Sequence, residues 1–140
     1  MKNTRIFALL LALICVFSLA SCFDAPDTVE LWRDATYSID TTLGTGEKTV
    51  SVSVTAAEKT VVFTINTNAA TLGEALISLG LVEGENGAYG LYIKRVNGIL
   101  ADYDVDQSWW GFYQNGEMMM TGVDGTAISG GESFELVYEK

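Results

Sequence analysis

Three aspartates at alternate positions, Asp102, Asp104 and Asp106, form a D-x-D-x-D run. Such a run opens calcium-binding loops, where carboxylates at positions one, three and five reach the same ion. The rest of that pattern is missing, because Gln107 stands where glycine makes the turn and Tyr113 stands where glutamate closes the site. We therefore predict a solvated acidic loop and keep the three aspartates as weak metal-ligand candidates.

The sequence contains no histidine, and its only cysteines are Cys15 and Cys22. Zinc sites of the Cys/His kind and Cys/His or Ser/His/Asp catalytic arrangements are therefore excluded. Three aspartates on one loop also do not form the two opposed carboxylates that glycoside hydrolysis needs. We predict that the protein is not an enzyme and carries no cofactor.

Aromatic residues gather at residues 109–114, a segment that reads as a strand. Neighbouring side chains of a strand point to opposite faces, so Trp109 and Trp110 cannot both be buried on one side. In one interpretation Trp110 and Phe112 pack under a helix, and Trp109 and Tyr113 lie on a partly covered outer face. In the other, the outer pair is an exposed platform for a ligand or partner. The candidate ligand-binding residues are Trp109, Trp110, Tyr113, Tyr92 and Asn115. Met118, Met119 and Met120, across the hairpin, are interpreted as adaptable packing.

Alternating apolar residues predict the strands that position these side chains. Residues 50–54 and 61–65 read as an antiparallel hairpin with a polar loop at residues 55–60. Residues 91–96, 109–114, 117–121 and 133–138 are further strands, and Asn-Gly pairs at 97–98 and 115–116 are strong turn signals. Residues 29–40 are interpreted as a peripheral strand.

One helix is predicted between these groups of strands. Thr71 and Glu74 have the spacing of a capping box, and Gly80 is the expected C-cap. The apolar residues between them recur at helical spacing and form one stripe, namely Leu72, Ala75, Leu76 and Leu79. The expected fold is α+β and β-grasp-like, with a mixed or antiparallel sheet of about five strands and one covering helix.

The N-terminal 21 residues have the features of a secretory signal peptide. Lys2 and Arg5 precede an uncharged apolar stretch at residues 6–19, which is shorter than a comfortable membrane span. The stretch ends in Leu-Ala-Ser-Cys at residues 19–22, which resembles the bacterial lipobox. We expect residues 1–21 to be removed, Cys22 to carry a diacylglycerol lipid, residues 22–28 to form a tether and residues 29–140 to form one domain. The expected location is outside the cytoplasm, on the cell membrane of a bacterium.

Charge limits the partners. The formal net charge is −10, from 18 acidic and eight basic residues. Such a surface repels phosphate backbones and argues against nucleic acid as a partner. It also offers no attraction to anionic lipid, so membrane attachment would depend on the acyl chains.

Four motifs taken together resemble the transcobalamin-like C-terminal domain: TLGEAL at residues 71–76, VNGI at 96–99, WWGFYQNGE at 109–117 and FELVY at 134–138. The resemblance covers about residues 48–139. One motif differs, because members often have Leu-x-x-Gly-Asp where this chain has Ile-Ser-Gly-Gly-Glu at residues 128–132.

The resemblance implies a β-grasp-like binding module of the kind found in bacterial surface proteins and in animal vitamin B12 carriers. It implies a non-enzymatic domain for a small molecule, with a corrinoid such as cobalamin as the candidate ligand. The alternative is a protein–protein, cell-surface assembly or adhesion module that uses the same aromatic face. Sequence alone leaves these two functions open, because a concave and a flat aromatic surface have the same residue pattern.

Overall fold

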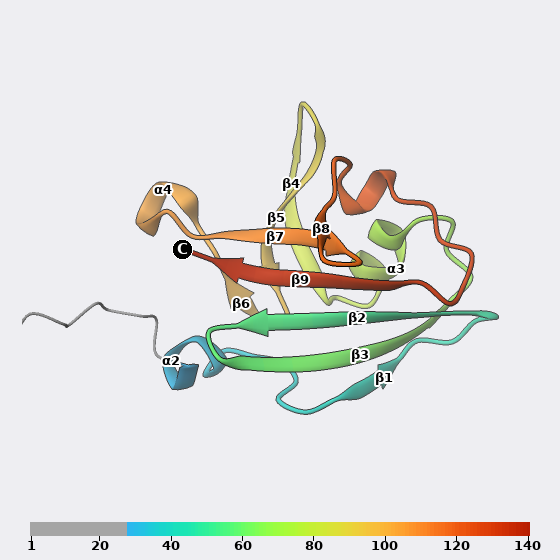
Figure 1. The fold of residues 1–140 in the computed structure, drawn as a ribbon, viewed down its shortest axis with the longest axis horizontal. Coiled ribbons are helices and arrows are strands. Elements are labelled where there is room, and N and C mark those ends of the chain that lie inside the picture. Colours follow the sequence, from blue (N-terminus) through green and yellow to red (C-terminus); the bar gives the residue numbers. More distant parts are fainter. Residues whose placement is uncertain (1–27) are drawn as a thin grey trace, which may run out of the picture.

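A computed structural model describes residues 28–140, which form two β-sheets with short helices at their margins (Figure 1). The elements, in chain order, are α2 (Thr28–Trp32), β1 (Thr41–Leu43), β2 (Lys48–Ala56), β3 (Lys59–Thr67), α3 (Leu72–Ser78), β4 (Val82–Gly87), β5 (Gly90–Val96), β6 (Ile99–Leu100), α4 (Tyr103–Asp106), β7 (Trp109–Gln114), β8 (Glu117–Met118), the 3-10 helix η2 (Val123–Gly125) and β9 (Ser133–Glu139). The predicted signal peptide, Cys22 and the tether up to residue 27 lie outside these residues.

The larger sheet has six strands in the order β1-β3-β2-β9-β7-β8. β2 and β3 form the predicted antiparallel hairpin, and β2 also pairs in parallel with β9. The polar loop expected at residues 55–60 is wrong, because Thr55 pairs with Thr60 and Ala56 with Lys59. Only two residues make the turn, and Ala57 adopts a φ of 53° there.

A second sheet of three strands, β4-β5-β6, corrects the expectation of one sheet with about five strands. β4 has the sequence VEGENG, in which only Val82 is buried. It therefore lacks the alternation that identifies a half-buried strand. Backbone pairing with β5 holds it in the sheet, with an irregular register between Glu83 and Gly84.

The hydrophobic core joins one face of the larger sheet to α3 and the smaller sheet. Val52, Phe63 and Phe134 come from three adjacent strands of the larger sheet and are almost completely buried. The apolar stripe of α3 is buried with them, as its spacing predicts. The opposite face of the larger sheet carries Ser51, Ser53 and Thr55 on β2, which alternate with the buried valines.

The predicted caps of α3 are present with two small differences. The backbone N–H of Glu74 donates to the Thr71 hydroxyl at 3.3 Å, while the Glu74 carboxylate accepts from Ala70 rather than from Thr71. The C-cap is Leu79, and Gly80 follows it with a φ of +67°. The N–H of Gly80 bonds to the Ile77 carbonyl and that of Leu81 to the Leu76 carbonyl, both at 3.0 Å. This is a Schellman ending, in which glycine supplies the left-handed residue.

The strand expected within residues 29–40 is absent, and this segment begins with the short helix α2. Hydrogen bonds that involve side chains, rather than backbone pairing between strands, attach this segment to the domain. The indole N–H of Trp32 donates to the carbonyl of Ala56 at 2.9 Å in a buried contact. The backbone of Tyr37 bonds to the side chain of Asn97 in both directions. Strand pairing begins only at β1, which runs parallel to β3.

Candidate functional site

The inner face of β7 packs against aromatic residues and the smaller sheet. Trp110 and Phe112 are both buried. Each lies 5.7 Å, between ring centroids, from an aromatic ring of β9: Trp110 from Tyr138 and Phe112 from Phe134. The indole N–H of Trp110 donates to the carbonyl of Ile99 in β6 at 3.3 Å. A strand of the smaller sheet therefore satisfies this indole, where the sequence had suggested a covering helix.

The outer face of β7 carries Trp109 and Tyr113, both half-buried. The Tyr113 ring lies across Gly111, since a Cβ built on Gly111 would stand 2.6 Å from a ring carbon. The Tyr113 hydroxyl donates to Oε1 of Glu139 at 2.9 Å. This bond, with partial burial, raises the pKa of Tyr113 above its usual value, because only the protonated phenol can donate. The ring is therefore held flat against the outer face.

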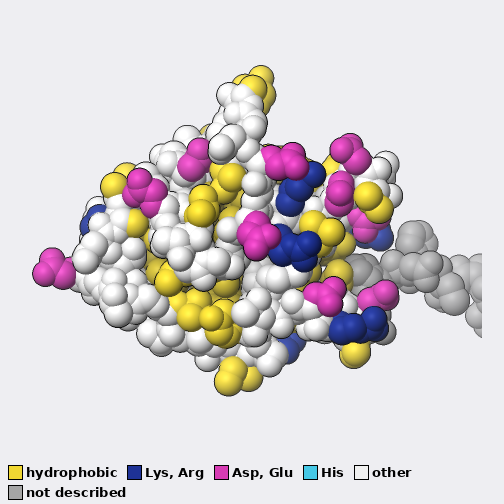
Figure 2. Space-filling model, turned by 180° about the vertical axis from the view of Figure 1, so that it is seen from behind, with side chains coloured by type: hydrophobic (Ala, Val, Ile, Leu, Met, Phe, Trp, Pro, Cys, Tyr) yellow, Lys and Arg dark blue, Asp and Glu magenta, His cyan; other side chains and the backbone are white. Residues whose placement is uncertain are grey.

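An apolar groove lies between the β4–β5 hairpin and the segment that follows β7. Its volume is about 280 Å³. The tip of the β4–β5 hairpin projects beyond the rest of the domain (Figure 1), and Figure 2 shows hydrophobic side chains at this tip and around its base. The lining residues come from the hairpin, from β7 and from the chain between β8 and η2: Tyr89, Leu91, Tyr92, Ile93, Trp109, Trp110, Phe112, Met118, Met119, Met120, Thr121, Gly122 and Val123.

The rim of the groove exposes large apolar side chains. Tyr89 is 100% exposed, Met120 97%, Met118 54% and Tyr92 45%. Deeper in the groove, Ile93, Trp110 and Val123 are buried and form a fixed floor. Exposed apolar groups gathered around one depression mark binding surfaces more often than single exposed residues do.

The structure brings some of the predicted ligand-binding residues together and separates others. Tyr92, Trp109 and Trp110 line the groove together with Phe112 of the inner face of β7, whereas Tyr113 does not line it. Asn115 stands in the β7–β8 turn with a φ of 54° and is exposed. The groove is therefore built mainly on the inner face of β7.

Sequence reasoning missed several groove residues. Tyr89 and Leu91 depend on a hairpin whose first strand has no hydrophobic pattern. Met118 and Met120 were interpreted as packing, yet both are exposed. The signal available in the sequence was Gly90 next to Tyr89, because glycine favours turns that need a positive φ. In the structure Gly90 has a φ of +103° at the turn that projects Tyr89.

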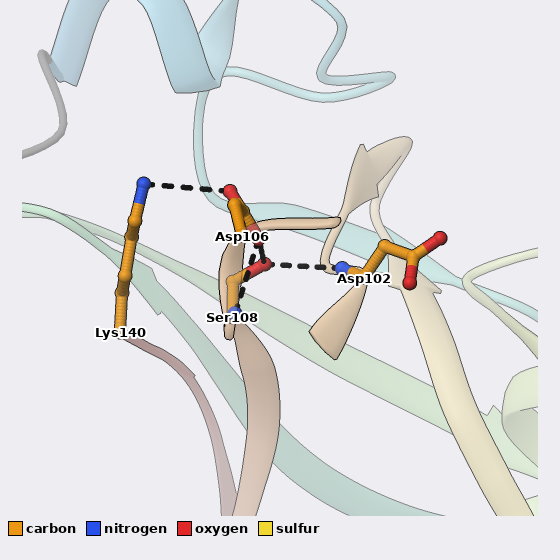
Figure 3. A network of polar contacts seen from close by, with 4 residues as sticks. All are labelled: Asp102, Asp106, Ser108 and Lys140. Atoms are coloured by element: carbon orange, nitrogen blue, oxygen red, sulfur yellow. Dashed lines mark hydrogen bonds and ion pairs between the residues drawn. The ribbon is translucent and has the colours of Figure 1, made fainter. Parts of the chain in front are cut away.

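The acidic segment forms the short helix α4, where the sequence predicted a loop. Asp102 caps it by accepting from the N–H of Asp104 at 3.1 Å. Figure 3 shows Ser108 between Asp106 and the backbone of Asp102, with Lys140 on the far side of Asp106. The Ser108 hydroxyl donates to Asp106 at 2.5 Å and accepts from the N–H of Asp102 at 3.0 Å. Lys140 Nζ lies 3.4 Å from the second oxygen of Asp106.

These contacts fit a structural role for the acidic segment. The hydrogen bond from Ser108 is the main cause that lowers the pKa of Asp106, and Lys140 adds to it. The Asp102 carboxylate therefore caps the start of α4, and the Asp106 carboxylate orders the end of α4 and the start of β7. Within residues 28–140, no three His, Cys, Asp or Glu side chains are grouped so that they could hold a metal ion. None of the helices in that range is long and apolar enough to cross a bilayer.

A family model described as "Domain of unknown function (DUF4430)" matches residues 69–140, more than half of the chain. The chain belongs to the DUF4430 family. The matched part runs from the start of α3 to the end of β9 and so contains every residue that lines the groove. No curated protein matches this DUF4430 chain.

Two solved structures resemble the DUF4430 chain. One is a protein from Ruminococcus gnavus ATCC 29149, described as a candidate metal-binding protein. It is 41% identical, covers 67% of this chain and 98% of its own length, and superposes with a TM-score of 0.63. The other is haptocorrin in complex with Cbi, at 19% identity and a TM-score of 0.54. It covers 70% of this chain, which spans only 26% of haptocorrin. The second likeness concerns the fold alone.

Proposed function

We propose that this DUF4430 protein is an extracytoplasmic bacterial lipoprotein whose domain is a non-enzymatic binding module. The lipid on Cys22 anchors it to the cell membrane, and the groove beside β7 receives a flat, largely apolar small molecule. A corrinoid such as cobalamin is the candidate ligand. The proposal extends to the finer family assignment, in which the domain is of the transcobalamin-like C-terminal kind.

The apolar groove with its exposed aromatic and methionine rim carries this proposal. Tyr89 and Tyr92 stand on the hairpin side, and Met118 and Met120 stand on the opposite side. Tyrosine offers a large, rigid contact area together with a hydroxyl that can bond to a polar edge of a ligand. Methionine adapts its shape to irregular apolar groups. The groove is lined mainly by aromatic and aliphatic side chains, and such a lining suits ligand binding better than catalysis.

The size of the groove limits how a corrinoid would bind. Pockets that enclose a drug-sized ligand have volumes of roughly 300–1,000 Å³, and this one has about 280 Å³. It would therefore cover one side or one edge of a large flat molecule, and a partner would cover the rest. Haptocorrin supports the ligand class only by fold, because it is 19% identical and nearly four times as long as the shared part.

The first experiment is a fluorescence titration of the full chain in detergent with cobalamin and cobinamide, corrected for corrin absorbance. Trp109 and Trp110 both border the groove, so a bound corrin should quench them in a saturable way. We expect Tyr89→Ala and Tyr92→Ala each to weaken binding about tenfold, which corresponds to about 1.4 kcal/mol.

Tyr103→Ala is the matched control. Tyr103 is an exposed tyrosine (55%) on α4 and does not belong to the groove. Its substitution should leave the affinity unchanged. An equal loss in all three variants would show nonspecific adsorption. No saturable change up to millimolar ligand would end the corrinoid proposal and favour a protein partner for the same rim.

The anchor has a separate test. Mass spectrometry of the purified protein should show a diacylglycerol-modified cysteine at the N-terminus, and Cys22→Ser should move the protein from the membrane fraction to the soluble fraction. If Cys22→Ser stays in the membrane fraction with its ligand binding intact, the anchor proposal is wrong while the binding proposal stands.

A further inference from the structure

Asparagine is followed by glycine at three places in the chain, at residues 86–87, 97–98 and 115–116. This dipeptide has a chemistry of its own, because the backbone nitrogen of the glycine can attack the side-chain amide carbon of the asparagine. Glycine has no side chain that would obstruct this approach. In a folded protein the reaction depends on how freely the amide and the backbone around it can move.

Asn97 lacks this freedom. It is completely buried, and its side-chain amide accepts from the N–H of Tyr37 at 2.9 Å and donates to the Tyr37 carbonyl at 2.8 Å. Its backbone N–H donates to the Leu81 carbonyl, and its own carbonyl accepts from the N–H of Thr36. For the ring to close, the amide must leave Tyr37 and the backbone must rotate. Both movements break buried hydrogen bonds, so the folded structure opposes the reaction here.

The other two asparagines, Asn86 and Asn115, are exposed, and within residues 28–140 neither side chain makes a hydrogen bond. Asn115 belongs to the β7–β8 turn, where a Cβ built on Gly116 would have no atom within 4 Å. Asn86 lies near the end of the β4–β5 hairpin, and only the pair Gly87–Gly90 follows it before the turn. The end of a hairpin opens more readily than the core of a domain. A small local opening is therefore enough for either amide to reach the next nitrogen.

We propose that Asn86 and Asn115 are sites of spontaneous deamidation, and that the fold protects Asn97 from it. The nitrogen of Gly87 or Gly116 loses its proton and forms a bond to the asparagine Cγ. This step releases ammonia and leaves a cyclic imide. Water then opens the imide at either of its two carbonyl carbons. One opening gives aspartate and the other gives isoaspartate, in which the main chain continues through the side-chain carbon; no atom is oxidised or reduced.

The two exposed sites belong to the two walls of the apolar groove. Asn86 pairs with Leu91, which lines one wall, and the turn that contains Asn115 leads to Met118 on the other. Each conversion adds a negative charge where a neutral amide stood, and isoaspartate also lengthens the backbone by a methylene group. Because β8 has only two residues, a longer turn would disturb the pairing of Met118 with Tyr113. Deamidation would thus alter both walls as the protein ages.

The inference goes beyond the proposed function, because it concerns a covalent change of this chain and needs no ligand. Its test is made without a corrinoid, and the corrinoid titration is made on freshly prepared protein. Either proposal can therefore fail while the other holds.

The test incubates the full chain in detergent micelles at neutral and at mildly alkaline pH, and digests samples under acidic conditions at successive times. Mass spectrometry follows the gain in mass when an amide becomes an acid, and electron-transfer fragmentation separates isoaspartate from aspartate. We expect Asn86 and Asn115 to react at least about tenfold faster than Asn97, whose buried hydrogen bonds must break first. Alkaline pH should accelerate both reactions, because the attacking nitrogen must lose its proton.

Two controls separate the effect of the fold from that of the dipeptide. In guanidinium, where the fold is lost, all three asparagines should react at similar rates. Asn115→Gly removes the amide and keeps a residue that tolerates positive φ, so its turn cannot react, while the rates at Asn86 and Asn97 should stay the same. Equal rates at all three sites in the folded protein would overturn the proposal. So would intact Asn86 and Asn115 after a time in which the denatured chain has reacted.

Discussion

The two Asn-Gly turns of this protein have the same sequence and nearly the same backbone, yet they occupy different environments. Asn97 and Gly98 have φ values of 51° and 81°, and Asn115 and Gly116 have 54° and 77°. Both pairs therefore close antiparallel strands with two left-handed residues, as their sequence predicts. Asn97 is completely buried, however, whereas Asn115 is exposed.

Asn97 is buried because it contacts the N-terminal segment, and Asn115 has no such contact. The Asn97 amide accepts from the N–H of Tyr37 at 2.9 Å and donates to its carbonyl at 2.8 Å. The backbone carbonyl of Asn97 accepts from Thr36, and its N–H donates to Leu81. One turn residue thus joins the N-terminal segment, the end of α3 and the smaller sheet. The β7–β8 turn instead ends at the surface, next to the exposed methionines. A turn signal predicts a turn, but its tertiary role depends on residues far away in the chain.

The sharpest way to separate the two turns is to add one methyl group to each glycine. A Cβ on Gly98 would stand 2.3 Å from the Asp34 carbonyl oxygen, whereas a Cβ on Gly116 would have no atom within 4 Å. Both substitutions carry the penalty of a left-handed alanine, about 1 kcal/mol. We expect Gly98→Ala to lower the free energy of unfolding by about 3 kcal/mol in total, because Asp34 must also move. Gly116→Ala should lower the free energy of unfolding only by the left-handed alanine penalty of about 1 kcal/mol.

Urea unfolding of the two glycine variants measures this difference, with equal m-values as the sign that the folded and unfolded states are comparable. Equal destabilisation would mean that the segment around Asp34 shifts freely, and the contrast between the turns would disappear.

The second test removes the amides and keeps the turns. Glycine adopts positive φ without strain, so Asn97→Gly and Asn115→Gly should both preserve the backbone. Asn97→Gly leaves the N–H and carbonyl of Tyr37 without their partners, and we expect a loss of about 2 kcal/mol. Asn115→Gly should change stability by less than about 0.5 kcal/mol. Hydrogen exchange of the Tyr37 amide checks the mechanism, because it should become faster only in the first variant.

The same distinction explains how much of the structure the sequence predicts. The β2–β3 hairpin, both ends of α3, both Asn-Gly turns and strands β7 and β9 follow from local periodicity or turn chemistry. The second sheet does not, because β4 has one buried residue and is held by backbone pairing. The strand expected in residues 29–40 is wrong, because this segment begins with α2 and is attached by the Trp32 indole and by two hydrogen bonds between Tyr37 and the Asn97 side chain.

The candidate site was predictable in its residue types but not in its geometry. Strand alternation correctly separates Trp110 from Trp109 and Tyr113. It does not reveal that the groove opens on the inner face of β7, because the missed β4–β5 hairpin forms the opposite wall. It also does not distinguish Met119, which packs, from its two exposed neighbours, since that depends on where β8 ends.

The smallest expected effect concerns the strand that leads into the exposed turn. There the hydrogen bond from the Tyr113 hydroxyl to Glu139 joins two strands. It is partly exposed to solvent, unlike the hydrogen bonds of the buried Asn97 amide at the other turn. This bond is the main cause that raises the pKa of Tyr113 above 10.0, ahead of burial and the charge of Glu139. Because the pKa is higher in the folded than in the unfolded chain, the contribution to stability is full below about pH 10 and is lost as the pH rises through the folded value.

Glu139→Gln should return the pKa of Tyr113 toward 10.0, as read from its ring ¹³Cζ shift during titration. Glu135→Gln, on the other neighbour of Tyr113 in β9, is the control and should leave the titration almost unchanged. An equal response to both substitutions would mean that the general negative charge of this face, rather than one directed bond, holds the ring.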